Sequence, residues 1–169
     1  GTYAIGQPTN GGGIRPRPYS TDFSINEMTY DWTNRSNISR PHGIGSVWAT
    51  MLWDLTWALI DEYGWDPDLY NGTGGNNIAM QLVTDGLRLQ NCSPGFVNGR
   101  DAILEADELA FGGANRCLIW EAFANRGLGE SASQGSAFNR FDQVESFDVP
   151  SDCALNIDDR GAASNFVVY

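Results

Sequence analysis

The sequence predicts a mainly α-helical domain, an orthogonal bundle of four helices that follows an irregular segment. The chain has 169 residues, a length that suits one domain able to bury a substantial core. Apolar residues recur at three- and four-residue steps in four separate stretches, which is typical of helices with one buried face. Short connections that contain glycine separate these stretches, so neighbouring helices are expected to pack across one another.

We expect three regions along the chain. Residues 1–41 are rich in Gly, Pro, Ser, Thr and Asn and predict an irregular segment that packs on the surface of the bundle. Residues 42–150 contain the predicted helices and form the helical lobe. Residues 151–169 are expected to be a tail or linker, in which the apolar residues 166–169 suit one short strand.

The first helix is predicted from Gly43 to about Tyr63, and Gly64 is expected to end it. Its wide apolar face indicates a largely buried helix. The residues of this face are Val47, Trp48, Met51, Leu52, Leu55, Leu59 and Ile60, and we expect Trp53, Trp57 and Ala58 to widen it.

Three further helices are predicted over residues 76–89, 99–109 and 114–125. In the helix over 76–89, one side is marked by Ile78, Leu82, Leu87 and Leu89. In the helix over 99–109, Ile103 and Leu104 are expected to point inward. The residues of that helix expected to point outward are Arg100, Asp101, Glu105 and Glu108. The Arg126-Gly127 pair is expected to end the last helix.

The charge balance argues against two classes of partner. The formal net charge is −11, from 21 acidic and ten basic residues, and every basic residue is arginine. Binding of phosphate groups depends on Lys and Arg side chains, so we expect neither nucleic acid nor an anionic membrane surface as a partner. The longest apolar run, residues 47–60, is shorter than the roughly 20 residues that a bilayer span needs.

The cysteines and the sequons both bear on the compartment. The spacing of Cys92, Cys117 and Cys153 fits no metal motif such as C-x2-C, and predicts one disulfide with one cysteine left over. A disulfide favours an oxidising, extracytoplasmic setting. Four N-x-S/T sequons, which permit N-glycosylation, occur at Asn34, Asn37, Asn71 and Asn91.

Five ordered blocks of sequence together resemble the fungalysin family of secreted zinc metallopeptidases. They are GIRPRPYSTD (13–22), HGIGSVWATMLW (42–53), GGNNIA (74–79), NCSPGFV with RDAIL (91–104), and GANRCLIW with AFANRGLG (113–129). One glycine-rich block would match by chance, but five blocks in the same order form a specific pattern. The resemblance covers about residues 1–150 and implies the C-terminal lobe of a thermolysin-like peptidase.

The same resemblance implies a two-lobe enzyme with zinc between the lobes. The zinc ligands of such enzymes include an H-E-x-x-H helix, whose two His residues one turn apart bind the metal while the Glu activates water. This chain has one His in total and therefore lacks that motif. We expect the zinc site to lie upstream of Gly1, to be supplied by another chain, or to have been lost.

The resemblance also implies roles for two residues. His42 corresponds to a His that stabilises the oxyanion of the tetrahedral intermediate, and Arg15 to an Arg that contacts a substrate carbonyl. The alternatives are a His42 exposed near the helix start without a role, and an Arg15 that only pins the N-terminal segment. The chain departs from the family at Pro41, where an aliphatic residue is usual, and at Ser46, where Glu is usual.

By the same resemblance, Cys92 and Cys117 are expected to form a disulfide, because the family carries Cys in both blocks. Cys153 would then be unpaired or would bridge to something outside this chain.

The predicted function is that of the C-terminal, substrate-cleft lobe of a secreted zinc endopeptidase, inactive alone. Its partners would be the missing zinc-binding lobe and a polypeptide substrate. The alternative is a non-catalytic structural module, such as an extracellular surface or filament subunit that associates with neighbouring copies of itself.

Overall fold

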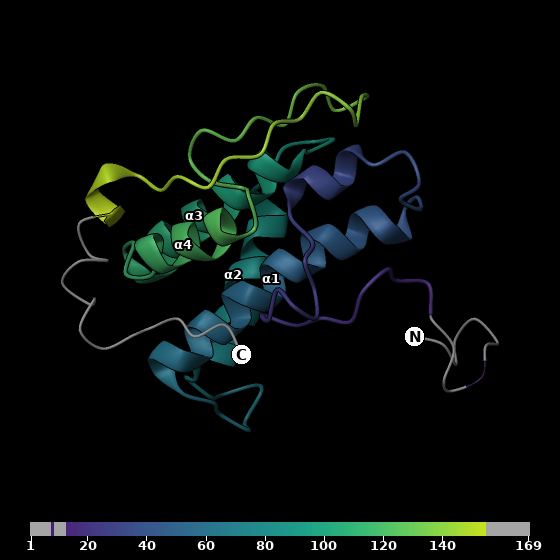
Figure 1. Ribbon diagram of the computed structural model, residues 1–169. Coiled ribbons are helices and arrows are strands. Elements are labelled where there is room, and N and C mark those ends of the chain that lie inside the picture. The colour runs from purple at the N-terminus through teal and green to yellow at the C-terminus, as the bar shows by residue number, and fades with distance from the viewer. Residues whose placement is uncertain (1–7, 9–12, 155–169) are drawn as a thin grey trace.

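The computed structural model describes residue 8 and residues 13–154. Over these residues the chain forms the 3-10 helix η2 (Tyr30–Asn34) and the helices α1 (His42–Tyr63), α2 (Gly75–Leu89), α3 (Phe96–Phe111) and α4 (Arg116–Asn125) (Figure 1). The predicted mainly α-helical class is confirmed, and each expected helix is present with shifts of at most three residues at an end. The strand expected over 166–169 lies outside the described residues.

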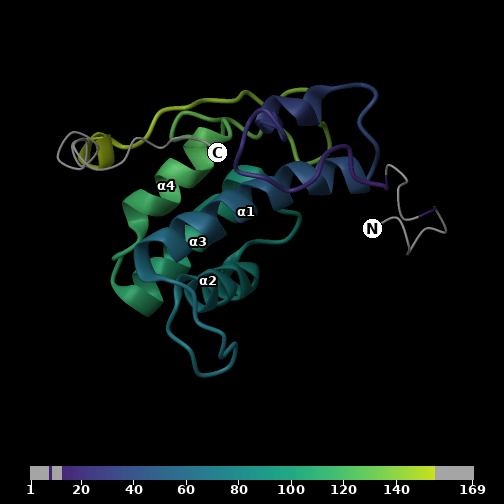
Figure 2. The same ribbon diagram turned by 60° about the horizontal axis from the view of Figure 1, so that its bottom comes forward.

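The bundle is organised around α1, the longest helix. Figures 1 and 2 show α2 and α4 beside it, and α1 contacts both, while α3 packs mainly against α2 and also against α4. Its most buried apolar side chains follow one another at four-residue steps, at Val47, Met51, Leu55 and Leu59. This spacing keeps them on one stripe of the helix and makes α1 the centre of the core.

Trp53 and Trp57 do not belong to the buried face of α1, contrary to the expectation from sequence. Their exposed fractions are 36% and 42%. Each follows a core residue, Met51 or Leu55, by two positions, which is about 200° around a helix and therefore points away from the core. The two indole rings instead contact each other edge to face, with centroids 6.0 Å apart.

Close approach between helices requires glycine at two positions. A Cβ atom at Gly75 would lie 2.1 Å from the carbonyl oxygen of Leu59, and one at Gly99 would lie 2.8 Å from the ring of Trp48. Any larger residue would push α2 and α3 away from α1, because packed interiors have no spare volume of this size.

Arg100 is buried, although the sequence placed it on the outer side of its helix. Its guanidinium donates to the carbonyl oxygens of Leu128, at 3.1 Å, and Gly129, and lies 4.3 Å from the centre of the Trp120 ring. The hydrogen bonds satisfy the charge inside the fold, which is the condition for burying an arginine. Leu87 and Leu89 were expected to mark the same side of α2 as Leu82, but both are exposed whereas Leu82 is buried.

Residues 13–41 are irregular apart from η2 and lie against the bundle, and Met28, Tyr30 and Trp32 contribute to the core. Residues 126–150 are again irregular, with isolated bridges from Leu128 to Ser146 and from Ser133 to Val144. No helix in the described ranges is long and apolar enough to cross a membrane.

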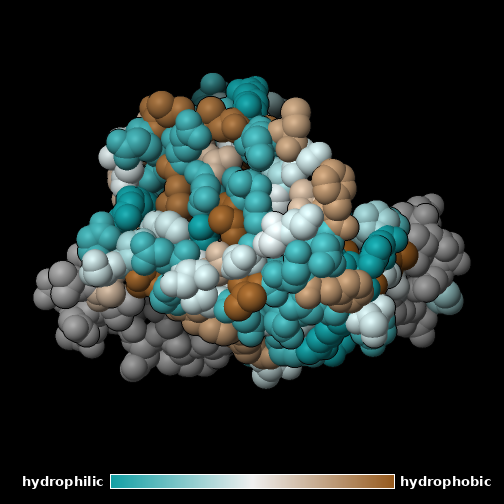
Figure 3. Space-filling model, turned by 90° about the horizontal axis from the view of Figure 1, so that it is seen from above, coloured by the Kyte–Doolittle hydropathy of each residue, from teal (hydrophilic) through white to brown (hydrophobic). Residues whose placement is uncertain are grey.

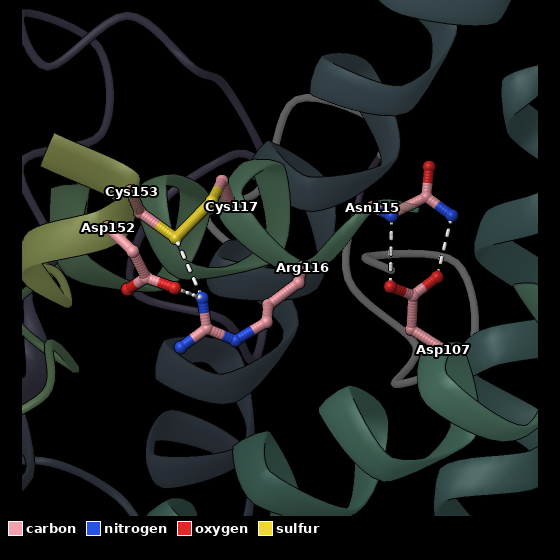
Figure 4. The surroundings of a disulfide bond; sticks show 6 residues. All are labelled: Asp107, Asn115, Arg116, Cys117, Asp152 and Cys153. Atoms are coloured by element: carbon pink, nitrogen blue, oxygen red, sulfur yellow. Dashed lines mark hydrogen bonds and ion pairs between the residues drawn. A yellow bond between two sulfur atoms is a disulfide. The ribbon is translucent and has the colours of Figure 1, made fainter. Parts of the chain in front are cut away.

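The disulfide joins Cys117 to Cys153, so the expected Cys92–Cys117 pairing is wrong, and so is the expectation that Cys153 is unpaired or bridges elsewhere (Figure 4). Cys92 is free and exposed in the connection between α2 and α3. Cys117 lies in the first turn of α4. The ion pair between Arg116 and Asp152, at 2.6 Å, holds the helical turn of residues 151–154 beside this end of α4. The cysteine that the sequence left over is therefore the one that closes the C-terminal part of the fold.

Candidate functional site

The candidate catalytic residue His42 is the first residue of α1. Pro41 precedes it as the N-cap, and the Arg40–Pro41 peptide bond is cis. Proline suits the start of a helix, because the first amide groups of a helix have no intrahelical acceptor. The imidazole is exposed, while the next residue, Gly43, is buried against Ile38. The side chain of His42 is therefore open to a ligand or another polypeptide at the end of the helix.

Arg15 lies over the same first turn of α1. Its Nη1 donates a hydrogen bond to the carbonyl oxygen of His42. A Cβ atom at Gly45 would lie 3.1 Å from that nitrogen, so the glycine makes room for the guanidinium. The structure thus brings the two candidate residues together through the backbone of His42, although they are 27 positions apart in the sequence.

A second arginine fixes the segment that carries Arg15. Arg17 donates to both carboxylate oxygens of Glu27, at 2.9 Å and 2.6 Å. This hydrogen bonding lowers the pKa of Glu27 to about 2. The bidentate pairing orients the backbone of the segment next to Arg15, but both side chains are exposed and the pair contributes little stability.

Ser46, which stands where the resembled family usually carries Glu, is directed at its own helix. It is fully buried, and its hydroxyl donates to the carbonyl oxygen of His42 at 3.1 Å. The same carbonyl therefore accepts hydrogen bonds from Arg15 and from Ser46. Ser46 contributes to the geometry of the helix start and offers no charge to a ligand.

The residues of this chain do not fit a catalytic zinc site. Such a site takes three protein ligands, and the whole sequence contains one His. Within the described ranges there is no group of three or more His, Cys, Asp or Glu side chains that could hold a metal ion.

A cavity of about 200 Å³ opens between α1, α2 and α3, away from the candidate residues. Trp48, Gly86, Phe96 and Ile103 line it together with neighbouring residues, and neither His42 nor Arg15 is among them.

A set of buried polar residues, none of which is a candidate from the sequence, holds the lobe together. Asp107 is fully buried and accepts from the backbone amide of Asn115 at 2.9 Å and from its side-chain amide at 2.6 Å, which ties α3 to the start of α4 (Figure 4). Asp54 and Arg126 form a buried ion pair at 2.6 Å. A signal for that pair was available, because a carboxylate in the middle of the apolar stretch of α1 requires a buried cation as its partner.

The sequence matches the profile of a known family, described as Fungalysin metallopeptidase (M36), over residues 1–132. It is 49% identical over 157 residues to Extracellular metalloproteinase MEP of Neosartorya fischeri and 47% identical over 150 residues to Extracellular metalloproteinase 10 of Coccidioides posadasii. These matches cover 89% and 85% of this chain and 23% of each relative. The chain thus spans about a quarter of the length of the curated relatives that it matches.

The match runs through the segment of Arg15, the start of α1 and the four helices, so the relationship includes the candidate residues as well as the core. The chain belongs to the fungalysin metallopeptidase family.

Proposed function

We propose that this chain is the C-terminal, substrate-cleft lobe of a secreted zinc endopeptidase. The observation that carries the proposal is the family membership combined with an exposed His42 at the start of α1 and Arg15 hydrogen-bonded to the same residue. In the proposal, residues 13–41 pack on a helical lobe that begins at His42. Secretion is proposed because the relatives are named extracellular metalloproteinases.

His42 is proposed to act on the transition state of peptide hydrolysis. An imidazole N–H that faces the cleft donates to the negative charge that develops on the scissile carbonyl oxygen. One preorganised donor of this kind contributes about 3 kcal/mol to lowering the barrier. The hydrogen bonds from Arg15 and Ser46 to the backbone of His42 support this role, since they fix the helix start from which the imidazole projects.

Zinc would be held by residues outside this chain, in the zinc-binding lobe of the complete enzyme. When bound, the metal would supply an activated water and a Lewis acid. The chain alone is therefore proposed to be inactive, because one His does not provide the three ligands of a catalytic site. The part that belongs to this chain is to orient the substrate and to stabilise charge through His42.

The alternative of a non-catalytic surface or filament subunit is not favoured. The relatives reported above carry metalloproteinase names, and a structural module would have no need of an exposed His held at the start of α1.

A chimaera tests the proposal. The matching segment of the Neosartorya fischeri metalloproteinase is replaced by this chain, and casein hydrolysis is measured beside the unmodified relative and the isolated chain. We expect the chimaera to cleave casein, to lose this activity with a chelator and to regain it with zinc. The isolated chain is expected not to cleave casein under any of these conditions. A chimaera that is secreted, folded and loaded with zinc yet inactive contradicts the proposal, and so does an isolated chain that holds one zinc ion tightly.

A further inference from the structure

The four sequons stand in different surroundings, which the sequence could not show. Asn34 is the last residue of η2 and is half-buried. Its amide nitrogen Nδ2 donates to Asp31 Oδ1 at 2.8 Å and to the carbonyl oxygen of Gln143 at 3.3 Å. This amide joins η2 to the irregular region after α4, so its nitrogen is already in use.

Asn37 and Asn91 are both exposed. Asn37 lies in the loop between η2 and α1, where only Ile38 of its sequon is buried. Asn91 lies in the connection between α2 and α3, and the residues that complete its sequon, Cys92 and Ser93, are exposed as well. A group attached to the side-chain nitrogen at either position extends into solvent without displacing a packed residue.

We propose that Asn37 and Asn91 carry N-linked oligosaccharides and that Asn34 does not. The inference rests on the secretion in the proposed function and is independent of the peptidase chemistry. The relatives named above are from fungi, whose secretory pathway supplies the donor, a lipid-diphosphate-linked oligosaccharide. In the transfer, Nδ2 forms a bond to C1 of the first sugar and gives up a proton, while the bond from C1 to the diphosphate breaks and the lipid diphosphate leaves.

The physical basis of the selection is what the folded chain tolerates. Glycosylation replaces one of the two hydrogens on Nδ2, so Asn34 would lose one of its two hydrogen bonds. One acceptor, either the exposed carboxylate of Asp31 or the part-buried carbonyl oxygen of Gln143, would then lack its donor, and the sugar would have to leave a half-buried position. At Asn37 and Asn91 neither cost arises. Figure 3 shows a face of the molecule on which hydrophilic side chains predominate, with apolar side chains among them.

Asn71 is outside the proposal. It is exposed, but its Nδ2 donates to Asp68 Oδ2 at 3.4 Å and its backbone amide donates to Asp68 Oδ1 at 3.0 Å. The side chain is therefore part of a hydrogen-bonded turn. Its surroundings differ both from those of Asn37 and Asn91 and from those of Asn34.

The test uses the full chain expressed with a secretion leader in a yeast. Trypsin and Asp-N together place the four sequons on separate peptides, 31–35, 36–53, 68–84 and 89–100. The peptides are then deglycosylated in heavy-oxygen water, which converts each glycosylated Asn into a labelled Asp that mass spectrometry detects. Peptides are taken from the folded protein of both the medium and the secretory compartments, so a chain that is not released still reports its glycans.

We expect label at positions 37 and 91 and none at 34. A folded chain without label at 37 or at 91 overturns the assignment at that position, and label at 34 equal to that at 91 overturns the structural selection. Activity of the chimaera is read separately, so failure here leaves the proposed function standing.

Matched variants give a second measurement. Ser93→Ala and Ser36→Ala each remove one sequon while keeping its Asn, at Asn91 and Asn34 respectively. We expect S93A to lose one glycan step in gel migration and S36A to migrate like the parent. Asn37→Gln is used at the third position, because Ser39 also accepts a hydrogen bond from the amide of Gly43. An S36A shift equal to that of S93A overturns the proposal.

Discussion

The guanidinium of Arg126 donates to both carboxylate oxygens of Asp54, at 2.6 Å to Oδ2 and 3.2 Å to Oδ1. Both side chains are buried, and burial raises the pKa of Asp54 while the hydrogen bond from Arg126 opposes that shift. Arg126 also donates to the carbonyl oxygens of Asn26, at 2.6 Å, and Ser20, at 2.9 Å. One side chain thus connects the end of α4, the middle of α1 and the N-terminal segment.

Arg126→Met is expected to lower the free energy of unfolding by about 3–5 kcal/mol, because it leaves the carboxylate of Asp54 buried without its cation. Urea denaturation measures the change. Arg17→Gln is the control, since it breaks an exposed pair with Glu27 and should cost under about 1 kcal/mol. Equal stability of the two variants would show that the buried pair does not hold the lobe together.

A peptide map of the non-reduced protein is expected to contain a Cys117–Cys153 linkage, with Cys92 alkylated before reduction. Cys153→Ser should lower the free energy of unfolding by about 4 kcal/mol on the chain-entropy model, given the separation of 36 residues. Cys92→Ser, which changes an exposed free thiol, is the control and should have little effect. A linkage between Cys92 and Cys117 would contradict the structure.

The sequence predicted the helices because each has a buried stripe with its own periodicity. The carboxylate of Asp54 indicates a buried cation, but the sequence does not show which arginine supplies it, because Arg126 lies 72 positions further along the chain. The burial of Arg100 likewise depends on the carbonyl oxygen of Leu128, 28 positions away. The predicted disulfide pairing was wrong for a related reason. The partner of Cys117 depends on the path of the chain after α4, which brings Cys153 next to the start of that helix. His42 and Arg15 were proposed from resemblance, and their contact is visible only in three dimensions.

Asp148 gives a prediction about acid stability. Its carboxylate accepts hydrogen bonds from the hydroxyl and backbone amide of Ser131 and from the hydroxyl of Ser146, and these lower its pKa from 3.8 to about 2. A depressed pKa stabilises the fold above pH 3.8, and that contribution is lost as the pH falls toward 2. The stability difference between the parent and Asp148→Asn should therefore shrink from pH 4 to pH 2, as measured by thermal unfolding. Parallel curves for the two proteins would refute this role.

Substitutions of Arg15 in the chimaera separate two roles. Lysine can still donate to the carbonyl oxygen of His42 but lacks the paired, planar donors that suit a substrate carbonyl. Arg15→Lys is therefore expected to keep kcat and to raise KM about tenfold, while Arg15→Ala lowers kcat as well. Arg17→Lys is the control. Unchanged kinetics for both Arg15 variants would leave Arg15 only the role of pinning the N-terminal segment.

The most direct measurement is the turnover of casein by the chimaera with His42→Ala. If His42 donates to charge that develops only in the transition state, kcat should fall about a hundredfold or more, with KM and the unfolding temperature nearly unchanged. Asp61→Asn, an exposed change near the other end of α1, should leave kcat at the parent value. A His42→Ala chimaera that turns over casein as fast as the parent would contradict the proposal that this lobe takes part in catalysis.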